Sequence, residues 1–97
     1  MTVRVRLGEG FQNNTVTVRL DGAQVYHRAG VSTDWTISRA DSVEAKTDAP
    51  SVKLEVTVDG GPSAVQDIDP AQTPFVEVRF VSGELLLLPM GEEPPML

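Results

Sequence analysis

The sequence of 97 residues predicts an all-β fold, most simply an antiparallel two-sheet β-sandwich of seven or eight strands. Apolar and polar residues alternate in several segments, as in strands with one face in a core and one in water. Turn signals rich in Gly, Asp, Ser and Pro separate these segments at the short spacing of sandwiches and small barrels. No apolar pattern at helical spacing continues for three turns.

Nine segments qualify as short strands. Asp21-Gly22 and Ser82-Gly83 each lie between two alternating runs with no other residue in between, which is the strongest short hairpin signal. Residues 40–46 fit either one helical turn or a strand, because Val43 and Ala45 also alternate. We expect strands near 2–7, 15–20, 23–29, 35–39, 43–47, 51–58, 64–68, 75–81 and 84–88.

The first hairpin turn predicts which side chains face the core. With Asp21-Gly22 as the turn, Val18 opposes Val25, so that Val25 and His27 face inward while Tyr26 faces outward. The expected core residues are Val5, Val16, Val18, Leu20, Val25, Trp35, Ile37, Leu54, Val56, Val78, Phe80, Leu85 and Leu87.

The second hairpin predicts an apolar surface where a sandwich should be polar. With Ser82-Gly83 as the turn, the face turned away from the core carries four apolar residues beside Glu77 and Arg79. We call these four the outer apolar face: Phe75, Val81, Leu86 and Leu88. Contiguous exposed apolar patches mark interaction sites. Four covers are open: the chain's own C-terminal residues, a loop, a second copy, or a different protein.

Composition bounds the function classes. The net charge of -6 disfavours non-specific nucleic-acid binding, which depends on Lys and Arg meeting phosphate. Without Cys the chain can form no disulfide, thiol nucleophile or Cys-ligated metal site. No apolar run has membrane-spanning length, and the N-terminus lacks a signal-peptide pattern. We therefore expect an intracellular protein with no membrane and no nucleic-acid partner, although a domain of a longer, exported protein stays open.

Charge is distributed unevenly along the chain. Residues 1–33 carry four arginines and two acidic residues, a net +2, whereas residues 34–97 carry four basic and twelve acidic residues, a net -8. The expected strands place the four arginines on outward faces, where they form either a basic stripe or ordinary cross-strand ion pairs. We favour ion pairs. These arginines are Arg4, Arg6, Arg19 and Arg28.

Catalytic signatures are missing from the sequence. His27 is the single histidine, and no serine lies in a Gly-x-Ser-x-Gly motif, so we expect no enzyme and no cofactor. A weaker alternative is a small ligand-binding module, with calcium held by Asp59, Asp67 and Asp69. In its carbohydrate form, Trp35 and Tyr26 would stack on a sugar. The plainer interpretation makes the aspartates turn caps and Trp35 a core residue.

The Asp21-Gly22 hairpin and the mid-chain Trp35, in this order of strands, resemble immunoglobulin-like or transthyretin-like β-sandwiches. The Cys pair of true immunoglobulin domains is missing, and these folds host many functions. We expect a single domain over residues 1–90 with a flexible tail at 91–97. Its expected function is non-catalytic protein interaction or assembly through the outer apolar face, with another protein or a second copy as the partner.

Overall fold

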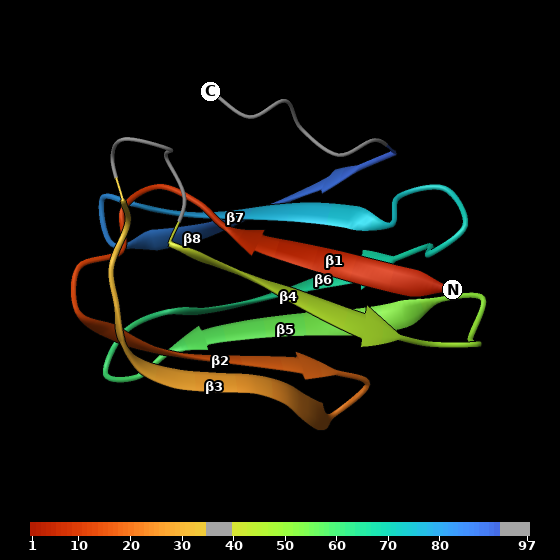
Figure 1. The fold of residues 1–97 in the computed structure, drawn as a ribbon, viewed down its shortest axis with the longest axis horizontal. Coiled ribbons are helices and arrows are strands. Elements are labelled where there is room, and N and C mark those ends of the chain that lie inside the picture. The colour runs from red at the N-terminus through yellow and green to blue at the C-terminus, as the bar shows by residue number, and fades with distance from the viewer. Residues whose placement is uncertain (35–39, 92–97) are drawn as a thin grey trace.

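The computed structural model describes residues 1–34 and 40–91, and the regular secondary structure in this part of the chain is all β-strand. Two four-stranded sheets pack face to face, which confirms the predicted two-sheet sandwich (Figure 1). The strands are β1 (Thr2–Leu7), β2 (Asn14–Leu20), β3 (Ala23–Val31), β4 (Asp41–Lys46), β5 (Val52–Val58), β6 (Ser63–Ile68), β7 (Phe75–Val81) and β8 (Glu84–Met90).

The chain crosses repeatedly between the two sheets. The first sheet has the order β4-β1-β7-β8 and the second the order β3-β2-β5-β6. Neighbouring strands are antiparallel except β1 and β7, which run parallel. This one parallel pair departs from the fully antiparallel arrangement predicted. It joins strands far apart in sequence, as parallel pairing requires a crossover connection.

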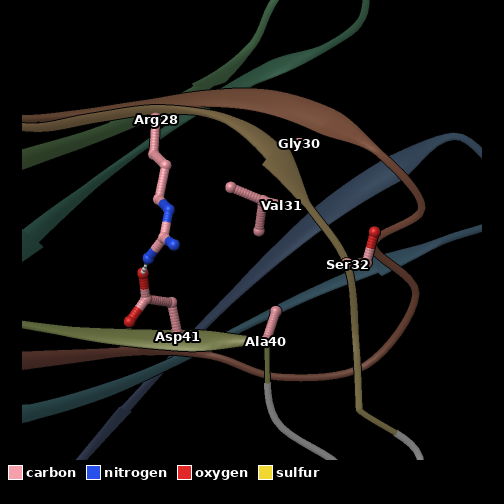
Figure 2. A pocket seen from close by; sticks show the side chains of 6 residues that line it. All are labelled: Arg28, Gly30, Val31, Ser32, Ala40 and Asp41. Carbon is pink, nitrogen blue, oxygen red and sulfur yellow. Dashed lines mark hydrogen bonds and ion pairs between the residues drawn. The ribbon is translucent and has the colours of Figure 1, made fainter.

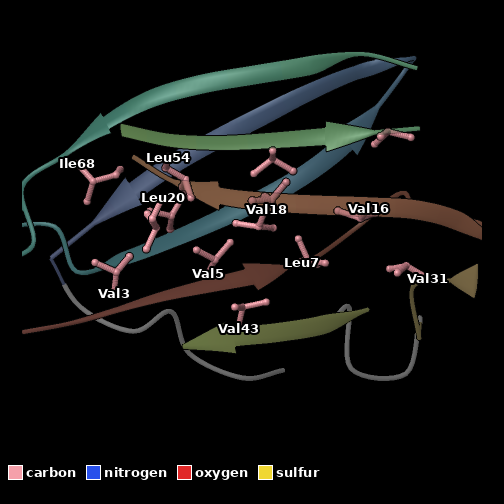
Figure 3. Packing of buried hydrophobic residues seen from close by; sticks show 14 of the residues in the cluster. Val3, Val5, Leu7, Val16, Val18, Leu20, Val31, Val43, Leu54 and Ile68 are labelled. Carbon is pink, nitrogen blue, oxygen red and sulfur yellow. The ribbon is translucent and has the colours of Figure 1, made fainter. Parts of the chain in front are cut away.

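Local sequence accounts for most strand positions. Eight of the nine predicted segments are strands, and 40–46 forms β4 rather than a helical turn. The ninth segment, 35–39, lies outside the described residues, and so does the predicted tail beyond Gly91. The strands β1, β2 and β5 bury every second side chain, and Figure 3 shows apolar side chains such as Val5, Val18 and Leu54 meeting between the sheets.

The core is larger than the alternation predicted. Seven expected residues are buried: Val5, Val16, Val18, Leu20, Leu54, Val56 and Val78. Three others, Phe80, Leu85 and Leu87, are partly buried against this core, while Trp35 and Ile37 lie outside the described residues. The prediction missed further buried side chains, namely Val3, Leu7, Phe11, Val31, Val43, Val52, Val58, Ile68 and Val76.

A β-bulge overturns the predicted register of the first hairpin. Arg19 pairs with Gln24 but Val18 pairs with Tyr26, so Val25 is an extra residue in β3. An extra residue reverses the faces of the residues that follow it, here as far as the second register shift, between the pairs Val16–Arg28 and Asn14–Val31. Val25 is consequently 37% exposed rather than buried, and Tyr26, not His27, turns toward the sandwich interior.

The loop between β1 and β2 closes one end of the sandwich. Phe11 is buried, with its ring centroid 5.9 Å from that of Phe80. The buried Thr33 hydroxyl accepts a hydrogen bond from the Phe11 amide at 2.9 Å and donates one to the Gly8 carbonyl at 2.7 Å. Gly10 has a φ of 96°, and a Cβ there would lie 1.6 Å from the Phe80 carbonyl oxygen. Only glycine fits this approach.

Candidate functional site

The second hairpin forms with the predicted register. Phe80 pairs with Leu85 and Val78 with Leu87, and these four side chains face the core. The other face of β7 and β8 therefore carries the residues of the outer apolar face. Val81 is 45% exposed and Leu86 is 42% exposed, while Phe75 and Leu88 are half-buried.

Met90 extends the row of outward-facing apolar residues on β8, Leu86 and Leu88; we call these three residues the apolar row. Met90 pairs with Phe75 across the hairpin and shares the outer side with Leu86 and Leu88. The strand predicted at 84–88 is two residues too short and leaves out Met90. Its signal was present in the continued alternation, but Pro89 interrupted the pattern. Val76 pairs with Pro89 at the edge of the sheet, where a proline is tolerated.

A buried ion cluster lies beside this apolar row. Glu77 is only 5% exposed, although it stands on the outer side of the first sheet. Its carboxylate accepts hydrogen bonds from Arg79 Nε at 2.8 Å and Nη2 at 2.7 Å, and Arg6 Nη2 lies 3.4 Å away. Arg6 Nε is buried and has no hydrogen-bond partner. The cluster links β1 to β7 and fixes the charged flank of the apolar row.

Phe75 lies apart from Val81 and Leu86, the two exposed residues of the outer apolar face. Along β7, the ion cluster of Glu77 and Arg79 stands between Phe75 and Val81. The Arg4 guanidinium lies 5.8 Å from the centroid of the Phe75 ring, and Arg4 Nε bonds Glu44 at 2.8 Å. The outer apolar face is therefore most open at its Val81 and Leu86 end.

The two sheets are joined by a polar cluster at the edge where β3 meets β4. The Tyr26 hydroxyl donates to Asp41 Oδ2 at 2.8 Å, and Arg28 Nη1 donates to the same oxygen at 3.0 Å. Desolvation and the neighbouring carboxylate raise the pKa of Tyr26 to about 12. Partial burial alone raises the pKa of Asp41, but hydrogen bonds from Tyr26, the Ser42 amide and Arg28 outweigh it and lower that pKa.

A pocket of about 190 Å³ lies beside this cluster (Figure 2). The Arg28 side chain lines one side of it and extends from β3 to Asp41 on β4. The Ser32 hydroxyl at the far side accepts a hydrogen bond from the Asn13 amide at 2.9 Å. Of the polar side chains that line the pocket, Arg28 and Asp41 thus bond to each other across the two sheets, and Ser32 bonds the backbone of the β1–β2 loop. The lining residues are Arg28, Gly30, Val31, Ser32, Ala40 and Asp41.

The four N-terminal arginines form no common stripe. Arg4 and Arg6 lie on the first sheet, whereas Arg19 lies on the second, 3.3 Å from Glu55. Arg28 points toward Asp41 between the sheets, because the bulge at Val25 reversed its face. Each of the four is ion-paired with a carboxylate; Arg4, Arg6 and Arg19 form the predicted cross-strand pairs, whereas Arg28 pairs across the two sheets.

His27 lies on the exposed side of the second sheet, and its predicted inward position is wrong. Its Nδ1 atom is 2.8 Å from the Thr17 hydroxyl oxygen. The bulge at Val25 accounts for this outward position, since it moves His27 opposite Thr17 instead of Val16. His27 is not among the residues that line the pocket.

The three aspartates of the calcium alternative do not converge. Asp67 pairs with Lys53 near one end of the β5–β6 hairpin, and Asp59 lies at its other end. Asp69 Oδ1 accepts a hydrogen bond from the Ala71 amide at 2.9 Å and so caps a turn, as the plainer interpretation predicted. Within residues 1–34 and 40–91, no group of three acidic or histidine side chains could hold a metal ion.

Comparison with protein-family models, with curated proteins and with solved structures gives no match. In the part of the chain that the structure describes, no helix has the length and apolar character needed to cross a membrane.

Proposed function

We propose that this protein is a non-catalytic interaction or assembly module that associates through its outer apolar face. One observation carries the proposal. Val81 and Leu86 are exposed as diagonal neighbours on a hairpin at the edge of the first sheet, where a sandwich strand should present polar residues. Single exposed apolar residues are ordinary, but a row that continues through Leu88 and Met90 is not.

The neighbouring ion cluster supports the same proposal. Glu77 and its two arginines hold the flank of the apolar row rigid, and rigid surfaces lose less conformational entropy on binding. An apolar centre with a charged rim is the usual anatomy of a protein interface. In this arrangement Leu86 and Leu88 form the centre, and Arg79 lies at the rim.

The proposed fold likeness is to immunoglobulin-like or transthyretin-like sandwiches. The arrangement of the strands in two sheets supports this likeness, and so does the short hairpin turn at Asp21-Gly22. Such sandwiches host many functions, so the proposed function depends on the face and not on the architecture.

The test replaces Leu86 with Asp and measures the solution mass and partner binding of the folded variant. A buried unpaired carboxylate opposes association strongly, so we expect Leu86→Asp to abolish it. Val65→Asp is the matched control, because Val65 is 52% exposed on the edge strand β6 of the second sheet. If Leu86→Asp and Val65→Asp behave alike in mass and in binding, the proposal is wrong.

A further inference from the structure

The outer edge of β8 carries backbone groups that the first sheet does not pair. Ser82 and Gly83 have φ values of 52° and 78°, which are those of a two-residue type I′ hairpin turn. In such a hairpin the closing pair, Val81 with Glu84, is hydrogen-bonded, and bonded pairs then alternate along the ladder. The N–H and C=O groups of Leu85 and Leu87 consequently point away from β7.

Pro89 agrees with this alternation. It occupies the next outward position after Leu87, where the ladder to β7 needs no N–H donor. The free edge of β8 therefore offers two complete donor–acceptor residues, Leu85 and Leu87, followed by a carbonyl without a donor at Pro89.

The four sheet edges differ in how they discourage pairing. The edge strand β3 carries two register shifts, and bulges disrupt an incoming ladder. The edge strand β4 carries Glu44 and Lys46, and β6 carries Asp67. From Leu85 to Met90, β8 carries no charge and no bulge. It is the least protected of the four edges and the one beside the outer apolar face.

We propose that a second copy of this chain adds to β8 as an antiparallel strand, with the two-fold axis at Leu86. This inference rests on the proposed function, because it names the partner and the mode of binding for that surface. Leu85 pairs with Leu87 of the partner subunit, and Leu87 pairs with Leu85 of the partner subunit. The two first sheets then form one continuous eight-stranded sheet.

The backbone pattern of β8 favours this register. Centring on Leu86 lets Leu85 and Leu87 of both copies use all their outward donors and acceptors, which gives four hydrogen bonds. Centring on Leu87 would place Leu85 opposite Pro89 of the partner subunit, which has no N–H to donate. The register centred on Leu86 is therefore the one in which Leu85 and Leu87 use every outward donor and acceptor, whereas centring on Leu87 leaves the Leu85 carbonyl of each copy without a donor.

Side chains on the outer side agree with the same register. Leu86 faces Leu86 of the partner subunit, and Glu84 faces Leu88 of the partner subunit. The two Glu84 carboxylates are thereby kept apart, so no like-charged pair forms across the axis. The apolar row of each copy continues into that of the other.

The chain's C-terminal residues are a poorer ladder partner for this edge. They have the sequence Gly-Glu-Glu-Pro-Pro-Met-Leu, and the two prolines lack the donors that an antiparallel ladder needs. Two glutamates would also be placed beside an uncharged edge. A second copy of β8 has neither drawback.

Single cysteines test the register, because the natural chain has none. Leu86 and its symmetry mate form a non-hydrogen-bonded pair with Cα atoms about 4.5 Å apart, within disulfide range. Leu88 and its mate are offset by four residues, about 13 Å along the strand. We expect oxidation to convert Leu86→Cys to a covalent dimer and to leave Leu88→Cys and Val65→Cys uncrosslinked. Preferential crosslinking of Leu88→Cys, or none at all, overturns the proposed register.

Hydrogen exchange separates strand pairing from simple face packing. In the unmodified chain, the Leu85 and Leu87 amides should exchange about tenfold more slowly at a concentration where about 90% of the chain is dimeric than in dilute monomer. A dimer that leaves both amides unprotected contradicts strand addition while the proposed function stands. Protection that is independent of concentration and vanishes in a chain ending at Gly91 also overturns the inference, because the chain's own C-terminus then covers the edge.

Discussion

Tyr26 and Asp41 show how one residue shift determines local chemistry. The bulge at Val25 turns Tyr26 toward β4, where its hydroxyl bonds the Asp41 carboxylate 2.8 Å away. Asp41 contributes stability above its unfolded pKa, because its folded pKa is lowered, and this contribution is lost as the pH falls through the folded value. Tyr26 has a raised pKa, so its contribution is complete below pH 10 and is lost toward pH 12.

Absorbance of the phenolate tests this pair directly, since Tyr26 is the only tyrosine. We expect a titration midpoint near 12 in the folded chain. Asp41→Asn should move the midpoint down, because it removes the carboxylate charge that opposes phenolate formation. A midpoint near 10 in the folded, unmodified chain would show that the Tyr26–Asp41 contact does not form.

Gly10 provides the sharpest steric prediction. Gly10→Ala places a methyl group on the Phe80 carbonyl oxygen and should cost at least about 3 kcal/mol of unfolding free energy. Gly22→Ala is the control, since Gly22 also has a positive φ, of 84°, but has open space where the methyl would lie. It should cost about 1 kcal/mol in the same denaturant titration. Equal losses for the two variants would mean that the loop at Gly10 does not approach Phe80 this closely.

At the scale of strands and hairpins, short-range sequence signals correctly predicted the two hairpin turns, because a tight turn depends on its own residues. Asp21-Gly22 and Ser82-Gly83 are both turns with left-handed φ values, and the second predicts its register in full. The first does not, because the bulge at Val25 shifts the pairing by one residue and no turn signal or glycine marks it in the sequence at Val25. For the same reason the face of His27 could not be predicted. The outer apolar face needed only the second register and was placed correctly on one side of the sheet.

The burial of Glu77 also could not be predicted from the alternation of apolar and polar residues. The pattern assigns it to an outer side, but parallel pairing of β1 with β7 brings Arg6 beside it. Such pairing joins distant segments, and no local signal specifies it. Phe11 and Thr33 were missed similarly, since both belong to loops that close the sandwich end.

The ion cluster should stabilise the pairing of β1 with β7. Glu77→Ala leaves Arg6 buried without its carboxylate and should cost about 2–3 kcal/mol in thermal or denaturant unfolding. Glu55→Ala is the matched control, because its pair with Arg19 is much more exposed, and it should cost less than about 1 kcal/mol. The cluster has no stabilising role if the two variants unfold alike.

At the scale of the whole molecule, an acidic sandwich pairs its described arginines internally and leaves one edge uncharged. Arg4, Arg6, Arg19, Arg28 and Arg79 all contact carboxylates. The remaining negative charge favours solubility and disfavours indiscriminate association. We propose that the uncharged stretch of β8 from Leu85 to Met90 restricts association to that edge, as a specific assembly module requires.

The solution mass of the unmodified chain, measured by light scattering over a range of concentrations beside Leu86→Asp, tests this account most directly. We expect a concentration-dependent dimer for the unmodified chain and a monomer for the folded variant. A monomer for both, together with no loss of partner binding in Leu86→Asp, would contradict the claim that the face around Leu86 is an interaction surface.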